Sequence, residues 1–114
     1  MDTNTFFEEL YRDFNDRNID KVIANMTENV KWANGMDGGH VIGHKSVRDY
    51  WTKQFEVVSS NVTPMTIIEE NGKVKISVHQ VVHDLKGNLL ADEMVYHVFS
   101  LSDDKIANFD IVKD

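Results

Sequence analysis

The chain has 114 residues, of which 41% are hydrophobic and 27% are charged, as is usual for a globular protein. That length suits one compact domain over residues 1–114 and is too short for two. The net charge of −7 disfavours a nucleic-acid partner, which needs clustered lysine and arginine, and the absence of cysteine excludes disulfides and thiol catalysis.

The start of the chain shows no secretory leader, because polar Asp2, Thr3 and Asn4 follow Met1 directly. No apolar run approaches the roughly 20 residues of a membrane-spanning helix. Together with the missing cysteines, these features predict a cytoplasmic protein without a membrane partner.

Three helices are predicted in the N-terminal half. The first covers residues 3–17, where aromatic and leucine side chains recur at three- and four-residue spacing, and Thr5 and Glu8 fit a capping box. Asp20 can cap a short second helix. The third helix is expected from Ser46 to about Val58, because its apolar residues follow one another at intervals of four, four and three residues.

The remaining elements are predicted to be strands. Residues 30–32 form a short strand, and residues 34–39 form a loop rich in side chains that tolerate a positive φ. Four longer strands separated by polar turns follow, at residues 63–70, 73–84, 89–101 and 105–112. Helices followed by a meander of strands indicate an α+β fold with an antiparallel sheet.

The last two strands form a hairpin whose turn decides the register. A three-residue loop, residues 102–104, pairs His97 with Phe109 and Val95 with Ile111. A two-residue loop is the alternative. It would set His97 opposite Asp110 in a dyad-like arrangement, because a one-residue slip exchanges the two faces.

The preceding turn is expected to pair Asp84 with Asn88. One face of the sheet then faces the helices and a pocket, and carries His79, Val81, His83, Val95, His97, Phe99, Phe109 and Ile111. The opposite face is also too apolar to remain in water, so we expect a homodimer interface there. It carries Ile76, Val78, Gln80, Val82, Met94, Tyr96, Val98, Asn108 and Asp110.

His97 is the main candidate for chemistry. It is a titratable group on an apolar wall, and an ordinary imidazole pKa of roughly 6.5 suits proton transfer near neutrality. The alternative is a core histidine bonded to a backbone carbonyl. His79, one strand away on the same expected face, is the second catalytic candidate. The expected pocket lining comprises Tyr11, Trp32, Trp51, Phe55, His79, Val81, Val95, His97, Phe99 and Phe109.

No metal site or cofactor is predicted. His79 and His83 lie four residues apart, which on a strand is about 13 Å and too far for one ion with bonds of about 2 Å. The sequence also carries no glycine-rich phosphate loop and no nucleophile motif.

Three segments carry a resemblance to a known family: Val30-Lys31-Trp32 before a glycine loop, residues 43–51 at the start of the third helix, and Asp104-Lys105-Ile106 in the last turn. Over nearly its whole length the chain resembles the SnoaL-like branch of the nuclear transport factor 2 (NTF2)-like superfamily. The resemblance implies a cone in which three N-terminal helices pack in a curved antiparallel sheet around an apolar pocket. That superfamily holds steroid isomerases, polyketide cyclases, dehydratases and non-catalytic binding modules, commonly as dimers.

Compared position by position, the chain matches some of the family's catalytic positions and lacks the catalytic residue at others. His97 falls where the isomerases carry a neutral carboxylic acid, but Trp32 replaces their base, and Leu10, next to Tyr11, replaces their oxyanion tyrosine. The cyclases' aspartate aligns with Ile111, or with Asp110 if one residue is deleted. We therefore transfer neither activity. The hypothesis is a domain that binds a small, largely apolar molecule, with acid/base chemistry at His97 and His79. The alternative is a non-catalytic ligand-binding or dimerisation module.

Overall fold

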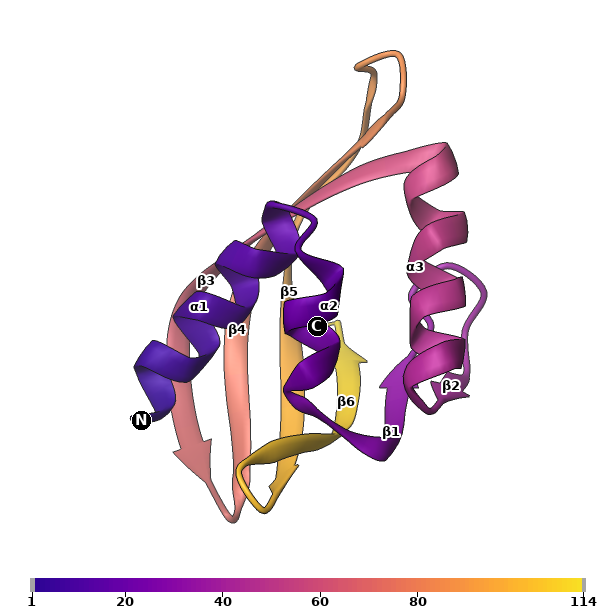
Figure 1. Ribbon diagram of the computed structural model, residues 1–114. Coiled ribbons are helices and arrows are strands. Elements are labelled where there is room, and N and C mark those ends of the chain that lie inside the picture. Colours follow the sequence, from indigo (N-terminus) through magenta and orange to yellow (C-terminus); the bar gives the residue numbers. More distant parts are fainter. Residues whose placement is uncertain (1, 114) are drawn as a thin grey trace.

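The computed structural model describes residues 2–113 and shows helices on one side of a curved sheet (Figure 1). The helices are α1 (Thr3–Asn15), α2 (Ile19–Ala24) and α3 (His44–Val57). The strands are β1 (Met26–Ala33), β2 (His40–Ile42), β3 (Val58–Glu70), β4 (Lys73–Asp84), β5 (Leu89–Ser102) and β6 (Lys105–Val112). The predicted α+β class and the cone of three helices in a curved sheet are confirmed.

The six strands form one sheet in the order β2-β1-β6-β5-β4-β3. All neighbouring pairs are antiparallel except β1 and β6, which run parallel because α3 and the meander separate them in the chain. The helix α1 lies across β3 and β4, and α3 stands beside β1 (Figure 1). None of the helices within residues 2–113 is long and apolar enough to cross a membrane.

Local sequence signals explain where the helices begin. Asp2, rather than the expected Thr5 and Glu8 pair, caps α1, because its carboxylate accepts a hydrogen bond from the Thr5 backbone N–H at 2.9 Å. The helix buries Phe7 and Tyr11 on one stripe. The helix α3 begins two residues earlier than predicted, directly after Gly43, whose φ of 89° favours glycine.

The hairpin of β5 and β6 has the two-residue turn that was the less favoured alternative. Asp103 and Asp104 both have positive φ, and Ser102 pairs with Lys105. A bulge in β6 then shifts the register, so that His97 faces Ile111. The predicted pairing with Phe109 and the alternative pairing with Asp110 are therefore both wrong, although His97, Phe109 and Ile111 still share one face.

The hairpin of β4 and β5 begins as predicted and then departs from it. The Asp84 backbone N–H donates to the Asn88 carbonyl at 2.9 Å, but a bulge next to His83 shifts every later pair by one residue. The inner face of β4 therefore carries Val74, Ile76, Val78 and Gln80. Its outer face carries Ser77, His79, Val81 and His83, so the predicted faces of β4 are exchanged.

The core lies between the inner face of the sheet and the helices. Phe99 of β5 is 1% exposed and packs against the rings of Phe7, Trp32 and Phe109 at centroid distances of 4.7, 6.2 and 5.0 Å. This aromatic cluster joins α1, β1, β5 and β6 in one core.

The register of β4 predicts opposite responses at two neighbouring positions. Ile76 is completely buried and Ser77 faces outward. We expect Ile76→Ala to lower the free energy of unfolding by about 2–5 kcal/mol, because it removes buried side-chain volume. Ser77→Ala should change it by less than about 1 kcal/mol. Urea denaturation of both variants tests the register, and an equal or larger loss in Ser77→Ala would contradict it.

Candidate functional site

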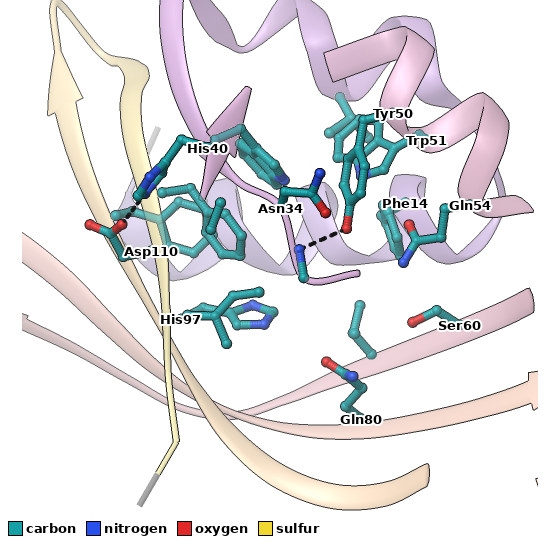
Figure 2. A pocket seen from close by; sticks show the side chains of 18 of the residues that line it. Phe14, Asn34, His40, Tyr50, Trp51, Gln54, Ser60, Gln80, His97 and Asp110 are labelled. Atoms are coloured by element: carbon teal, nitrogen blue, oxygen red, sulfur yellow. Dashed lines mark hydrogen bonds and ion pairs between the residues drawn. The ribbon is translucent and has the colours of Figure 1, made fainter. Parts of the chain in front are cut away.

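A cavity of about 540 Å³ lies between the helices and the inner face of the sheet. Aromatic rings form a large part of its walls. Trp32 stacks on Phe109 with a centroid distance of 4.1 Å and an interplanar angle of 26°, and Trp51 meets Trp32 edge-on at 5.3 Å. Phe14 of α1 packs against Trp51 at 5.4 Å. These rings offer flat apolar surfaces to a bound molecule (Figure 2).

A hydrogen-bonded pair of side chains forms the polar centre of the cavity wall. The Tyr11 hydroxyl oxygen lies 2.6 Å from His97 Nδ1, and the two rings are nearly parallel. Tyr11 reaches this position because it lies on the buried stripe of α1, and His97 because the register of β5 turns it inward. Within residues 2–113, no side chain or backbone group bonds to His97 Nε2, so this atom is left for a ligand.

Burial sets the protonation of this pair. His97 is 6% exposed, and desolvation of the charged imidazolium lowers the pKa of His97 to about 3. Desolvation of the phenolate raises the pKa of Tyr11 well above its ordinary value. Both side chains are therefore neutral near pH 7. If Tyr11 donates to Nδ1, then Nε2 carries the proton and donates into the cavity.

The low pKa changes what His97 can do. A group with an ordinary pKa near 6.5 exchanges protons at neutral pH, whereas one with a pKa of about 3 is a weak base. A neutral imidazole still donates one hydrogen bond and accepts another. The geometry therefore supports a hydrogen-bonding or carbonyl-polarising role for His97 better than that of a general base.

A second histidine lies at the rim of the cavity. His40 Nε2 is 2.6 Å from Asp110 Oδ1 (Figure 2). The Asn108 amide donates to Asp110 Oδ2 at 2.8 Å. The hydrogen bond with His40 is the main cause that lowers the pKa of Asp110. Asp110 pairs with Val98 in the sheet and so points away from His97. The dyad expected from the two-residue turn is replaced by a different pair, which the β6 bulge and the short strand β2 bring together.

The loop of residues 34–39 closes one side of the cavity. The Asn34 carboxamide accepts hydrogen bonds from the backbone N–H groups of Met36 and Asp37 at 3.0 and 2.9 Å. The Tyr50 hydroxyl accepts from the Gly35 N–H at 3.0 Å (Figure 2). A side chain at Gly35 would crowd this contact, because its Cβ would lie 3.3 Å from Ile111 Cδ1. The loop therefore packs directly against the cavity wall.

Six of the expected pocket residues line the cavity: Tyr11, Trp32, Trp51, His97, Phe99 and Phe109. The other four do not. Val95 is 1% exposed and belongs to the core instead of the cavity wall. Phe55 packs against Phe14 and the Arg17 guanidinium. His79 and Val81 lie on the outer face because of the bulge between β4 and β5. His79 bonds Asp92 there at 2.6 Å, with 42% of its side chain exposed, so it neither contacts nor orients His97.

Several lining residues were not expected. Phe14 shares the apolar stripe of Tyr11, and that spacing was a usable signal. Three uncharged polar side chains, Gln54, Ser60 and Gln80, also line the cavity, but only the observed register reveals that Ser60 and Gln80 face inward. The lining also includes Asn34, His40, Tyr50 and Asp110. No cluster of three or more metal-ligating side chains lies among residues 2–113.

The curved sheet, the three helices and the cavity between them define an NTF2-like protein. A family model of the SnoaL-like domain matches residues 7–109, and the chain belongs to that family. The resemblance seen in the sequence is therefore confirmed. No protein with a curated description matches the sequence significantly.

Solved structures share the fold at low identity. An NTF2-like protein of unknown function from Burkholderia pseudomallei is 22% identical, with a TM-score of 0.86, covering 100% of this chain and 92% of its own. TerC, co-crystallized with polyporic acid, is 24% identical, with a TM-score of 0.81 and coverages of 92% and 85%. An epoxide hydrolase of the LEH-like type from M. tuberculosis is 16% identical, with a TM-score of 0.78 and coverages of 95% and 79%.

The buried state of His97 predicts a pH dependence of stability. The pKa of His97 is about 3 in the folded chain and roughly 6.5 in the unfolded chain. Between these two pH values, only the unfolded chain binds a proton at His97. The free energy of unfolding is therefore unaffected by His97 above about pH 6.5, and it decreases as the pH falls from there towards 3.

His97→Gln removes this proton uptake. From pH 7 to pH 5, we expect the native sequence to lose about 2 kcal/mol more unfolding free energy than the variant. Urea denaturation of both proteins at the two pH values measures the difference, in which contributions from other titrating groups cancel. Parallel pH profiles would show that His97 is not held neutral by burial.

Proposed function

We propose that the protein binds a small, largely apolar molecule in this cavity and holds an oxygen atom of that molecule through His97 Nε2. The observation that carries the proposal is the neutral Tyr11–His97 pair set into an aromatic wall. His97 Nε2 has no partner within residues 2–113, and His97 lines the cavity, so this atom can form a hydrogen bond with a bound molecule. A carbonyl or hydroxyl oxygen of a ligand supplies that partner.

The size and lining of the cavity support this proposal. Cavities that bind small molecules usually measure about 300–1,000 Å³ and are mainly apolar, with a few polar groups that orient the ligand. The cavity of about 540 Å³ falls in this range. TerC, which shares the fold, was crystallised with polyporic acid, and this supports a small-molecule ligand here as well.

The finer proposal is acid/base chemistry of the isomerase, cyclase or dehydratase kind. In it His97 polarises the substrate oxygen, and the His40–Asp110 pair at the rim is the group suited to accept a proton. The alternative is a module that binds its ligand without reaction. The weak basicity of His97 favours that alternative, as does the absence of any carboxylate bonded to His97 within residues 2–113.

The role of His97 is tested with naphthalene and 2-naphthol, which differ by one hydroxyl group. The double variant Tyr11→Phe/His97→Phe removes both partners of the buried pair, which avoids leaving one polar group unbonded. We expect it to bind 2-naphthol about 2- to 12-fold more weakly than the native protein, and naphthalene within about twofold. Isothermal titration calorimetry gives both affinities.

Thermal unfolding of the double variant is the control for its fold. Failure of the native protein to bind either probe below about 1 mM would overturn the proposed cavity ligand. Equal loss of both probes in the variant would remove His97 as the polar anchor.

We also propose that the outer face of the sheet pairs two copies of the chain. Its apolar area is smaller than the sequence suggested, because Ile76 and Val78 turn inward. Met94 remains 55% exposed and shares this face with Tyr96 and Val98, and such apolar area on a sheet face favours association.

Charge introduced on this face tests the proposed pairing. Light scattering of the native protein at micromolar concentration should give twice the chain mass of 13.1 kDa. Met94→Lys should shift the mass towards 13.1 kDa, because a buried unpaired charge at an interface is costly. Met36→Lys, in the loop of residues 34–39, is the matched control and should stay dimeric. A monomeric native protein would refute the interface.

A further inference from the structure

The part of the cavity away from His97 contains a cluster of uncharged polar side chains, which we call the amide cluster: Gln54 on α3, Ser60 on β3 and Gln80 on β4 (Figure 2). The register places two of them together. Ser60 pairs with Val82 and Val62 pairs with Gln80, so Ser60 and Gln80 are diagonal neighbours on the inner face. Gln54 lies above them in Figure 2.

Gln54 has an unused hydrogen-bonding atom. Its Oε1 atom is enclosed, and no group within residues 2–113 bonds to it. Gln54 lies three residues after Trp51, so it is on the same side of the helix as the residues that α3 buries in the core. An apolar side chain there would avoid the cost of an unbonded buried acceptor. The amide therefore lowers the free energy of unfolding, and stability of the fold does not explain its presence here.

The other two members also present free polar atoms. Ser60 is 5% exposed, and its backbone carbonyl accepts from Arg17 at 2.8 Å, but no group in the described chain bonds its hydroxyl. The same holds for the side-chain amide of Gln80. Arg17 also donates to the Phe14 carbonyl and does not line the cavity. The cluster is thus neutral and can accept and donate hydrogen bonds.

From this arrangement we infer that the amide cluster is a second polar subsite, which takes a neutral hydroxyl group of the ligand. The inference rests on the proposed function and adds to it the class of ligand. The ligand is an apolar molecule with two polar ends, one oxygen held by His97 and a hydroxyl held by the amide cluster. A carboxylate or ammonium group does not fit, because no member of the cluster is charged.

The inference is tested with pairs of phenols that differ by a second hydroxyl. The monohydroxy probes are 2-naphthol and 4-phenylphenol, and their dihydroxy partners are 2,6- and 2,7-dihydroxynaphthalene and 4,4′-biphenol, which span several lengths. Calorimetry compares the native protein with Gln54→Leu, which keeps the side-chain size and removes the acceptor. Lys53→Leu, on the exposed side of the same helix, is the matched control.

We expect at least one dihydroxy probe to bind the native protein and Lys53→Leu about 3- to 10-fold more tightly than its monohydroxy partner. In Gln54→Leu this gain disappears, while the monohydroxy probe binds within about twofold of native affinity. Gln54→Leu should melt at or above the native temperature, because it loses an unbonded buried acceptor. If Gln54→Leu melts below the native temperature, Ser60→Ala is used in its place in the binding test.

The outcomes separate the two proposals. If no monohydroxy probe binds, the proposed function itself fails. If monohydroxy probes bind but no dihydroxy probe gains affinity, the second subsite is wrong while the His97 site stands. A gain that persists in both Gln54→Leu and Ser60→Ala also overturns the subsite, because the second hydroxyl is then held elsewhere.

Discussion

Two one-residue bulges determine which side chains enter the cavity, and the rest of the site depends on them. The bulge next to His83 turns Ile76, Val78 and Gln80 inward, and it places His79 outside. The bulge in β6 keeps Phe109 and Ile111 on the face of His97. Side chains alternate along a strand, so each extra residue exchanges the two faces from that point onward. Without the first bulge, polar side chains would replace the aliphatic floor of the core.

Burial then determines the chemistry of the residues that the register brings inside. His97 and Tyr11 lie in an aromatic wall with little water, where charged forms are costly, and they satisfy each other with one hydrogen bond. The imidazole consequently stays neutral and retains one nitrogen for a ligand. The ionised Asp110 lies at the rim, where it bonds His40 and remains partly exposed. The cavity is neutral inside and charged at its edge.

The helices and most strands could be predicted because their signals are local: apolar spacing on α1 and α3, and polar turns at residues 84–88 and 102–104. The placement of His97 and Phe99 on one face also followed from alternation within β5. Phe109 was expected on that face because of a three-residue turn that does not occur, and the β6 bulge is what places it there. The bulges could not be predicted, because a bulge is favoured by packing across the whole sheet and not by a residue type at the site. The Tyr11–His97 hydrogen bond joins positions 86 residues apart, and no local sequence pattern predicts such a contact.

The same physical argument explains why the polar groups of the cavity are the informative ones. An aromatic wall such as Trp32 on Phe109 stabilises the empty fold as well as a bound ligand, so it does not by itself indicate binding. The enclosed, unbonded amide oxygen of Gln54 has the opposite effect, because it lowers the stability of the fold. A site with a free nitrogen at His97 and unbonded polar side chains at Ser60 and Gln80 is therefore suited to a neutral molecule with two polar ends. Apolar rings alone would have favoured a plain hydrocarbon core.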